Sequence, residues 1–282
     1  MTLSSNKNFD NNSAISERVL HSAFYRFVAI DNVDQMVAHL RDLSAALLGS
    51  ILVATEGING VVAGTAAALE CFEKALSADS RFAGMAFKHS ACTTAPFGRM
   101  KVHKKSEIVA IGVDGVDAVR QTGISVSPQQ WRALLADEDV VVIDNRNSFE
   151  FRLGRFRQAI DPQVANFRDL PTFIEANVPA WQAAGKKIAM YCTGGIRCEK
   201  TSAWMHDKGI DVYQLEGGIL NYFQSMPDAE KDWQGECFVF DNRIALDTHL
   251  QETETTLEQV YDGEPDGEWR LERARRLDRS GR

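Results

Sequence analysis

The chain has 282 residues, of which 44% are hydrophobic and 25% are charged, and its formal net charge is −8. The length indicates two domains rather than one, and the composition is typical of a globular protein. No run of about 18 or more apolar residues occurs, so no membrane-spanning helix is expected.

The acidic charge is concentrated near the C-terminus. From Asp228 onward there are 15 acidic and 8 basic residues, against 24 acidic and 23 basic residues before it. The overall charge argues against nucleic-acid binding, but this uneven distribution leaves the first 227 residues nearly neutral. A basic face for RNA is therefore compatible with the sequence.

The cysteines and the N-terminal residues indicate the compartment. The five cysteines are Cys71, Cys92, Cys192, Cys198 and Cys237. Their number is odd, their spacing is scattered and no C-x-x-C pair occurs, so we expect neither a disulfide framework nor a metal site. Residues 1–19 are polar and lack the apolar segment of a secretory signal, which predicts a disordered lead-in. A cytoplasmic location is expected.

Residues 20–115 follow a β-α-β-β-α-β order. Strands are expected at 24–30, 49–55 and 61–65, with further strand at 82–87 and 101–111. One helix is expected between the first two strands and another over 66–76, where apolar residues recur at helical spacing. This order predicts a ferredoxin-like, or acylphosphatase-like, α+β domain.

Residues 127–230 alternate strands with helices after a predicted linker at 116–126. Ser127 and Pro128 begin a helix as N-cap and first helical residue. The apolar run at 140–144 is typical of a parallel strand buried on both faces. We therefore expect an α/β domain with a parallel sheet and a ligand site at the carboxyl ends of its strands. Residues 231–282 are predicted to be a charged, partly disordered extension.

A cysteine follows one of these strands directly. The apolar run at 188–191 leads into Cys192, two glycines and then Arg197 at the start of a helical pattern. Glycines let backbone N–H groups turn toward one anion, and the helix start adds its positive dipole end. Both effects lower the pKa of a thiol, so Cys192 is the predicted nucleophile and Arg197 its cationic partner.

The neighbours of Cys192 are expected to support this loop. They are Thr193, Gly194, Gly195, Ile196 and Cys198. Cys198 either resolves an oxidised Cys192 as a disulfide or packs as a small buried residue. Asp144 and Arg146 follow the preceding strand and are expected to brace the loop as an ion pair.

Several short motifs together resemble the rhodanese fold over about residues 125–230. They are D-x-R at 144–146, Glu150, G-x-F-x-x-A at 154–159, the Cys192 loop and E-G-G at 216–218. Four residues separate Cys192 from Arg197, one fewer than in the related dual-specificity phosphatases. The shorter loop makes a smaller cradle, sized for a sulfur atom, which argues against phosphatase activity.

Three longer motifs narrow the resemblance from the rhodanese fold to one family. They are T-E-G-I-N-G at 55–60, C-T-G-G-I-R-C-E-K at 192–200 and C-F-V-F-D at 237–241. With the predicted domains they resemble the rhodanese-domain tRNA uridine hydroxylases, over about residues 20–245. The resemblance implies oxygen-dependent conversion of the wobble uridine at position 34 to 5-hydroxyuridine, with molecular oxygen as co-substrate and the tRNA anticodon arm as partner, and no DNA.

The sequence also indicates which cofactor, metal and RNA-binding residues to expect. No G-x-G-x-x-G motif occurs, so no flavin or nicotinamide cofactor is expected. Many members of the family carry a cysteine-rich C-terminal segment that resembles a zinc site, but no cysteine follows Cys237 here, so no metal is expected. Phosphate contacts are expected from basic residues. The candidates are Arg99, Lys101, Lys104 and Lys105, with Arg152 and Arg155. A sulfurtransferase that carries a Cys192 persulfide, and a redox-sensing binding module, are the alternatives.

Overall fold

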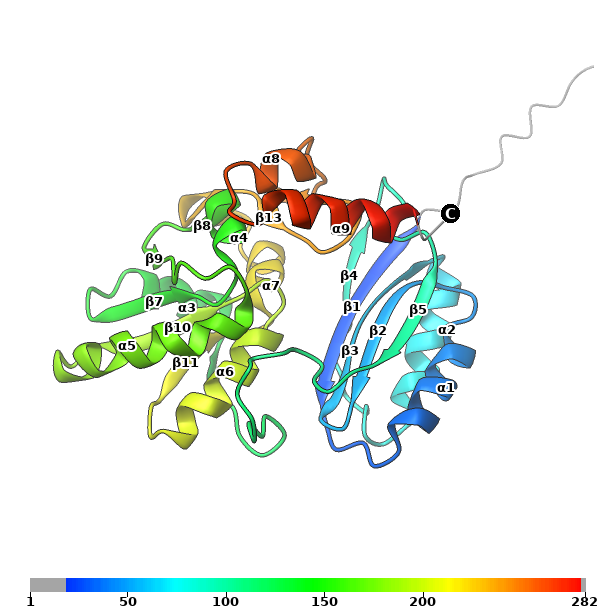
Figure 1. Ribbon diagram of the computed structural model, residues 1–282, viewed down its shortest axis with the longest axis horizontal. Coiled ribbons are helices and arrows are strands. Elements are labelled where there is room, and N and C mark those ends of the chain that lie inside the picture. The colour runs from blue at the N-terminus through cyan, green and yellow to red at the C-terminus, as the bar shows by residue number, and fades with distance from the viewer. Residues whose placement is uncertain (1–18, 280–282) are drawn as a thin grey trace, which may run out of the picture.

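The computed structural model describes residues 19–279, so the lead-in predicted for 1–19 lies almost wholly outside the described residues. Two sheets, each with its own helices, face each other, and the C-terminal segment lies across one end of both (Figure 1). Within residues 19–279, no helix is long and apolar enough to cross a membrane.

The first sheet has the strand order β4-β1-β3-β2-β5. Its elements are β1 (Leu20–Phe27), α1 (Val33–Leu43), β2 (Leu48–Ala54), β3 (Gly57–Gly64), α2 (Ala66–Ser77), β4 (Lys88–Ala91) and β5 (Met100–Lys104). The first four strands have the antiparallel order of the split β-α-β plan, which confirms the predicted ferredoxin-like domain. β5 adds a fifth strand, parallel to β2.

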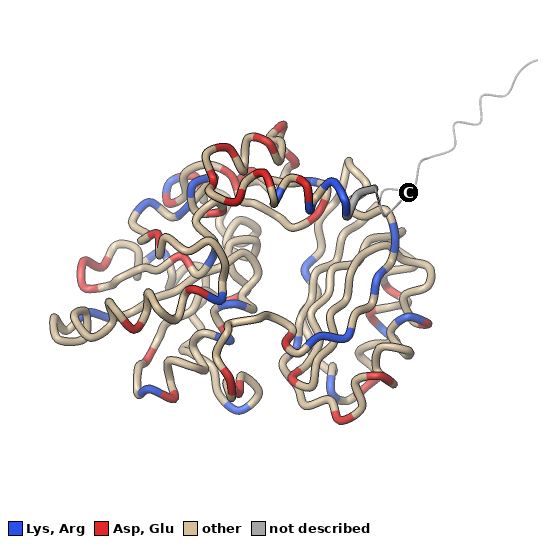
Figure 2. The backbone as a smooth tube through the Cα atoms, viewed as in Figure 1, with Lys and Arg blue, Asp and Glu red and all other residues tan. Residues whose placement is uncertain are grey.

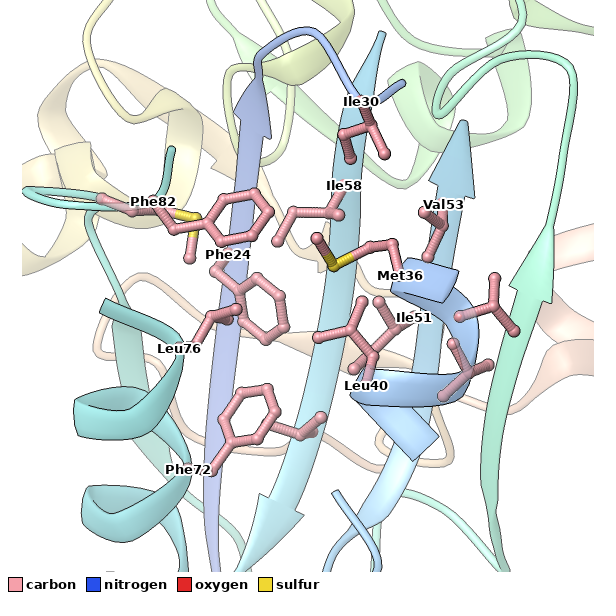
Figure 3. Close-up of a cluster of buried hydrophobic side chains, with 14 of the residues drawn as sticks. Phe24, Ile30, Met36, Leu40, Ile51, Val53, Ile58, Phe72, Leu76 and Phe82 are labelled. Atoms are coloured by element: carbon pink, nitrogen blue, oxygen red, sulfur yellow. The ribbon is translucent and has the colours of Figure 1, made fainter. Parts of the chain in front are cut away.

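Both helices cover one face of this sheet. Phe24, Ile51 and Ile58 point from the strands toward Met36 and Leu40 of α1, in one buried apolar cluster with α2 (Figure 3). Because side chains alternate along a strand, the intervening residues lie on the opposite face, which is turned toward the second domain (Figure 1). That face is the one available to a ligand.

Several expectations for this domain were wrong. The first strand ends at Phe27 rather than at 30, and the third begins at Gly57 rather than at 61. Residues 82–87 form turns rather than a strand, because Phe82 and Met85 bury their side chains beneath the sheet, and the fourth strand follows at 88–91. The last strand ends at Lys104 instead of continuing to 111. Beyond it the chain crosses to the second domain, where Ile111 is buried against other apolar residues.

The second sheet is parallel throughout, as predicted, with the order β6-β11-β10-β7-β9. Its strands are β6 (Ile124–Val126), β7 (Val140–Asp144), β9 (Ala159–Ile160), β10 (Lys187–Tyr191) and β11 (Val212–Leu215). Its helices are α3 (Pro128–Leu135), α4 (Ser148–Leu153), α5 (Leu170–Ala183), α6 (Ile196–Asp207) and α7 (Gly218–Ser225), with the 3-10 turn η1 (Phe167–Asp169). β6 belongs to this sheet, although its residues fell within the predicted linker.

The C-terminal extension is built into the fold up to residue 279. It carries η2 (Ala229–Lys231), β12 (Trp233–Gly235), β13 (Cys237–Phe238), β14 (Ala245–Leu246), α8 (Leu257–Tyr261) and α9 (Gly267–Arg279). β12 pairs with β8 (Gly154–Phe156) of the second domain, and the Trp233 and Phe156 rings lie 5.1 Å apart. The partial disorder expected for 231–282 does not apply to these described residues, because their apolar side chains pack against the second domain.

Candidate active site

Cys192 follows β10 in the middle of the parallel sheet and is fully buried. The backbone N–H of Gly195 donates a hydrogen bond to its Sγ at 3.1 Å. Gly195 has a φ of +103°, a left-handed conformation that strains other residues, and it caps α6. The glycine thus aims an N–H group and a helix N-terminus at the sulfur.

The surroundings of Cys192 favour a thiolate. Burial alone raises the pKa, but a hydrogen bond from Cys198, the charge of Arg197 and the Gly195 N–H outweigh it and hold the Cys192 pKa well below its usual value. Burial and the adjacent Cys192 raise the pKa of Cys198 well above its usual value. These opposite shifts favour the thiolate form of Cys192 and the protonated form of Cys198.

Arg197 is held by a buried carboxylate. Its two terminal nitrogens donate to the two Glu150 oxygens at 2.7 and 2.8 Å, and one also contacts Thr193 Oγ1 at 3.2 Å. Burial raises the Glu150 pKa, but Arg197 outweighs that effect and the net shift is downward. Glu150 therefore fixes the guanidinium beside the cysteine in a bidentate pair.

Asp144 and Arg146 lie behind the loop, both fully buried. Arg146 donates to both Asp144 oxygens, at 2.8 and 2.6 Å, and to the carbonyl of Gly154 at 2.6 Å. Tyr191, the last residue of β10, donates its hydroxyl to Asp144 at 2.6 Å. This network anchors the strand end that precedes Cys192, an arrangement suited to bracing rather than chemistry.

The first domain adds a lysine to the cysteine loop. Lys88 of β4 donates hydrogen bonds to the carbonyl of Gly194 and, at 3.0 Å, to that of Gly217. Burial lowers its pKa to about 8, although the charges of Cys192 and Glu199 oppose that shift. An ammonium group from one domain therefore contacts the cysteine loop of the other.

Tyr25 of β1, also in the first domain, approaches the cysteine loop at Gly195. A Cβ placed on Gly195 would lie only 2.8 Å from the Tyr25 hydroxyl oxygen, so this approach also requires glycine. Burial raises the Tyr25 pKa, and so does its hydrogen bond to Glu199 of α6. The phenol is therefore a neutral hydrogen-bonding group at the loop.

A buried ion pair joins the domains beside these contacts. Lys200 of α6 pairs with Glu56, and with Glu107 at 3.1 Å, and its side chain is 3% exposed. Glu56 also accepts the Ile108 N–H at 2.8 Å, and Asn59 donates to the Ile108 carbonyl at 3.1 Å. The segment at 55–60, which comprises a two-residue turn and the start of β3, is thus part of the domain junction.

A cavity of about 910 Å³ lies between the two domains and the extension. Its walls include Tyr25 and Lys88 of the first domain, Cys192 and Arg197 of the second, and Phe240 of the extension. This volume is within the range of small-molecule sites. Within residues 19–279, no group of three or more His, Cys, Asp or Glu side chains is arranged to hold a metal ion.

Comparison with known proteins places this chain in a family. Residues 19–108 match the UPF0176 acylphosphatase-like domain and residues 127–225 the rhodanese-like domain. A tRNA uridine(34) hydroxylase from Synechococcus elongatus is 49% identical over 81% of this chain and 85% of its own length. The chain belongs to the tRNA uridine(34) hydroxylase family.

Other members of the family give the same result. The tRNA uridine(34) hydroxylase of Brucella anthropi is 44% identical over 84% of this chain and 78% of its own length. That of Legionella pneumophila is 40% identical over 86% of this chain and 96% of its own length. The similarity thus spans both domains and reaches into the extension, as the motifs indicated.

Most predicted loop residues line the cavity. Cys192, Thr193, Gly194, Ile196 and Arg197 do so. The remaining loop and support residues, Gly195, Cys198, Asp144 and Arg146, are not among its lining residues.

None of the six predicted RNA-binding residues lines the cavity. Lys101 and Lys104 are on β5, with Arg99 and Lys105 at its two ends. Lys104 pairs with Asp34 of α1 at 2.8 Å. On the other side of the molecule, Arg152 pairs with Glu264, and the Arg155 guanidinium lies 5.0 Å from the ring of Phe151.

The sequence did not indicate several groups around the cysteine. Lys88 and Tyr25 lie far from Cys192 in the chain, and no spacing rule connects them with it. Phe240 was noticed only as part of the motif at 237–241, without a role. Glu150 was noticed only as part of the rhodanese-like pattern, without a role. Glu199 follows Cys198 directly, but its hydrogen bond to Tyr25 depends on how the domains are arranged.

Proposed function

We propose that this protein hydroxylates the wobble uridine of tRNA at position 34 to 5-hydroxyuridine, in the cytoplasm. Relatives with 40% or more identity over most of the chain carry the corresponding name. The observation that carries the proposal is Cys192, whose pKa is held low and which shares with Arg197 and Lys88 a cavity of about 910 Å³ between both domains.

The first step uses the electrophilic C6 atom of uracil. The Cys192 sulfur donates an electron pair to C6, and the C5=C6 electrons move toward C5 and the C4 carbonyl oxygen. The resulting enolate is negative, and Lys88 and Arg197 are the cations that line the cavity beside the sulfur. Cations placed where charge develops stabilise the transition state more than the ground state.

The second step adds oxygen and releases the enzyme. The nucleophilic C5 attacks hydrogen peroxide, which a two-electron reductant forms from molecular oxygen; the C5–O bond forms, the O–O bond breaks and the second oxygen atom leaves as hydroxide. A base then removes the C5 proton, the C–S bond breaks and the C5=C6 double bond returns. The oxidant takes up two electrons, Cys192 leaves as a thiolate, and uridine has gained one oxygen atom.

The anticodon arm is the proposed RNA partner, docked against the open face of the first sheet. Val102 packs under the helices, so its neighbours Lys101 and His103 lie on the opposite face, beside Ser50 and Leu52. Leu52 lines the cavity, so this face is continuous with the site. Basic residues lie along β5 (Figure 2). There they would contact RNA phosphates.

Mass spectrometry of tRNA nucleosides tests this function. A strain lacking the gene should lose 5-hydroxyuridine and its derivatives, the wild-type chain should restore them, and Cys192→Ser should not. Purified enzyme given labelled molecular oxygen should place the label in the product, whereas labelled water should not. Full modification by Cys192→Ser would contradict the thiolate mechanism.

The cysteine loop itself favours a second candidate function. A thiolate held by the Gly195 N–H and a helix N-terminus also suits a persulfide, which a sulfurtransferase passes to an acceptor. In this case the deletion strain keeps its 5-hydroxyuridine, and the purified protein transfers sulfur from thiosulfate to cyanide. A redox-sensing module would show neither activity.

A further inference from the structure

Phe240 is an exposed aromatic residue at the cavity that the steps above do not use. Its relative exposure of 64% is the highest of any large hydrophobic residue described. It lines the same cavity as Cys192, and the Arg197 guanidinium lies 5.9 Å from the centre of its ring. An open apolar ring therefore lies beside the reactive loop.

Packing on the protein side fixes the position of this ring. Phe240 meets Phe238 edge to face, with centroids 4.9 Å apart and an interplanar angle of 88°. Phe238 is buried and in turn packs against Phe149 of α4, with centroids 5.1 Å apart. The Phe240 ring is thus held against Phe238 of the extension, which is itself packed against Phe149 of the second domain.

The backbone on either side of Phe240 is also anchored. The Val239 N–H donates to the Ile244 carbonyl at 2.8 Å. The Asp241 side chain is 4% exposed and accepts from Arg243 at 2.8 and 2.7 Å, and buried Arg243 donates to Ser90 Oγ of β4 at 2.7 Å. The turn is therefore tied to both domains, while the Phe240 ring stays exposed.

We propose that Phe240 is the platform on which the target base stacks while Cys192 reacts with it. This inference rests on the proposed function and assigns a base-binding site to it. An aromatic face binds a flat pyrimidine by stacking, and the wobble base is single-stranded, so it can leave the loop without breaking a duplex. Uracil is a small base, and a rigid platform lowers the entropic cost of orienting it.

Trp269 offers a matched control. It is also an exposed aromatic residue, at 49%, but it belongs to α9 and does not line the cavity. The Arg273 guanidinium lies 5.2 Å from its ring centre. Replacing Trp269 by Ala removes a comparable exposed ring without touching the proposed base site.

The experiment measures the affinity of the full-length chain for two anticodon stem–loop RNAs, by fluorescence anisotropy. One RNA carries uridine at the wobble position, and the other carries an abasic nucleotide there. Phe240→Ala should weaken binding of the uridine RNA on the order of 10-fold to 100-fold and leave binding of the abasic RNA unchanged. Phe240→Tyr should restore affinity, and Trp269→Ala should bind both RNAs as the wild type does.

Equal affinity of Phe240→Ala and the wild type for the uridine RNA overturns the stacking role. Equal weakening for both RNAs also overturns it, because a general defect does not depend on the base. The proposed function is judged separately, by whether the wild-type protein hydroxylates the uridine RNA under oxygen. Base-dependent binding without hydroxylation contradicts that function and supports the stacking site.

Discussion

Lys88 of the first domain donates a hydrogen bond to the carbonyl oxygen of Gly194 in the cysteine loop of the second domain. Its second bond, to Gly217 at 3.0 Å, joins the loops that follow β10 and β11. A rhodanese-like domain alone lacks this ammonium group. The N-terminal domain therefore completes the candidate active site.

The Lys88 charge should appear in the pH dependence of hydroxylation. Burial lowers the pKa of Lys88 to about 8, so the ammonium loses its proton as the pH rises through that value. If the charge stabilises the enolate, the rate falls above about pH 8. Lys88→Met should reduce the rate by about 100-fold at neutral pH.

Lys88→Arg provides the control for this prediction. The guanidinium stays charged across the whole range, so the decrease in rate should move to higher pH. Initial rates measured from about pH 6 to about pH 10 test both variants. An alkaline decrease that stays near pH 8 in Lys88→Arg would assign it to another group.

Cys192 should be a thiolate at neutral pH. The ultraviolet thiolate absorbance of the wild type, minus that of Cys192→Ser, should persist well below the usual thiol pKa of about 8.5. Cys198→Ala should raise the pKa of Cys192, because it removes a hydrogen bond that lowers it. A titration that is the same in Cys198→Ala and the wild type would contradict this role of Cys198.

The same shift affects folding. Because the Cys192 pKa is lower in the folded state, the thiolate contributes stability at a pH above the unfolded thiol pKa. This contribution is lost as the pH falls toward the folded-state pKa. Cys192→Ser should therefore remove part of the acid dependence of the free energy of unfolding, which urea titrations at several pH values measure.

Glu150→Gln should destabilise the fold and disturb the loop. The change leaves the Arg197 charge buried without its bidentate partner, which costs about 3 to 5 kcal/mol of unfolding free energy. Glu175→Gln is the matched control, since its ion pair with Lys208 is exposed and contributes less than about 1 kcal/mol. Urea unfolding measures both; equal stability of the two variants would mean that Glu150 is dispensable.

Charge-reversal variants of β5 test which face of the strand contributes to tRNA binding. Lys101→Glu combined with Lys105→Glu should weaken tRNA binding and flatten its salt dependence, because these residues are proposed to lie on the open face. Lys104→Glu should have a smaller effect, because Lys104 pairs with Asp34 of α1 on the helical side. Unchanged affinity of the double variant at low salt would remove this strand from the RNA site.

Much of the architecture follows from local sequence. The apolar runs before Asp144 and Cys192 are buried on both faces, and parallel strands bring their carboxyl ends to one edge of a sheet. Cys192, the glycines and Arg197 are close in the chain, so the geometry of one turn brings them together. The sequence by itself therefore determined the second domain, the position of its cysteine loop and the split β-α-β order of the first domain.

Only the tertiary structure decided what surrounds the cysteine. Lys88 precedes Gly194 by 106 residues, and its contact with the loop depends on the packing of the two domains, which no spacing encodes. The same holds for Phe240, an exposed residue whose place at the cavity depends on a turn anchored to both domains. Local propensities set helices, strands and loops over a few residues, whereas a site between domains depends on the sum of many distant contacts.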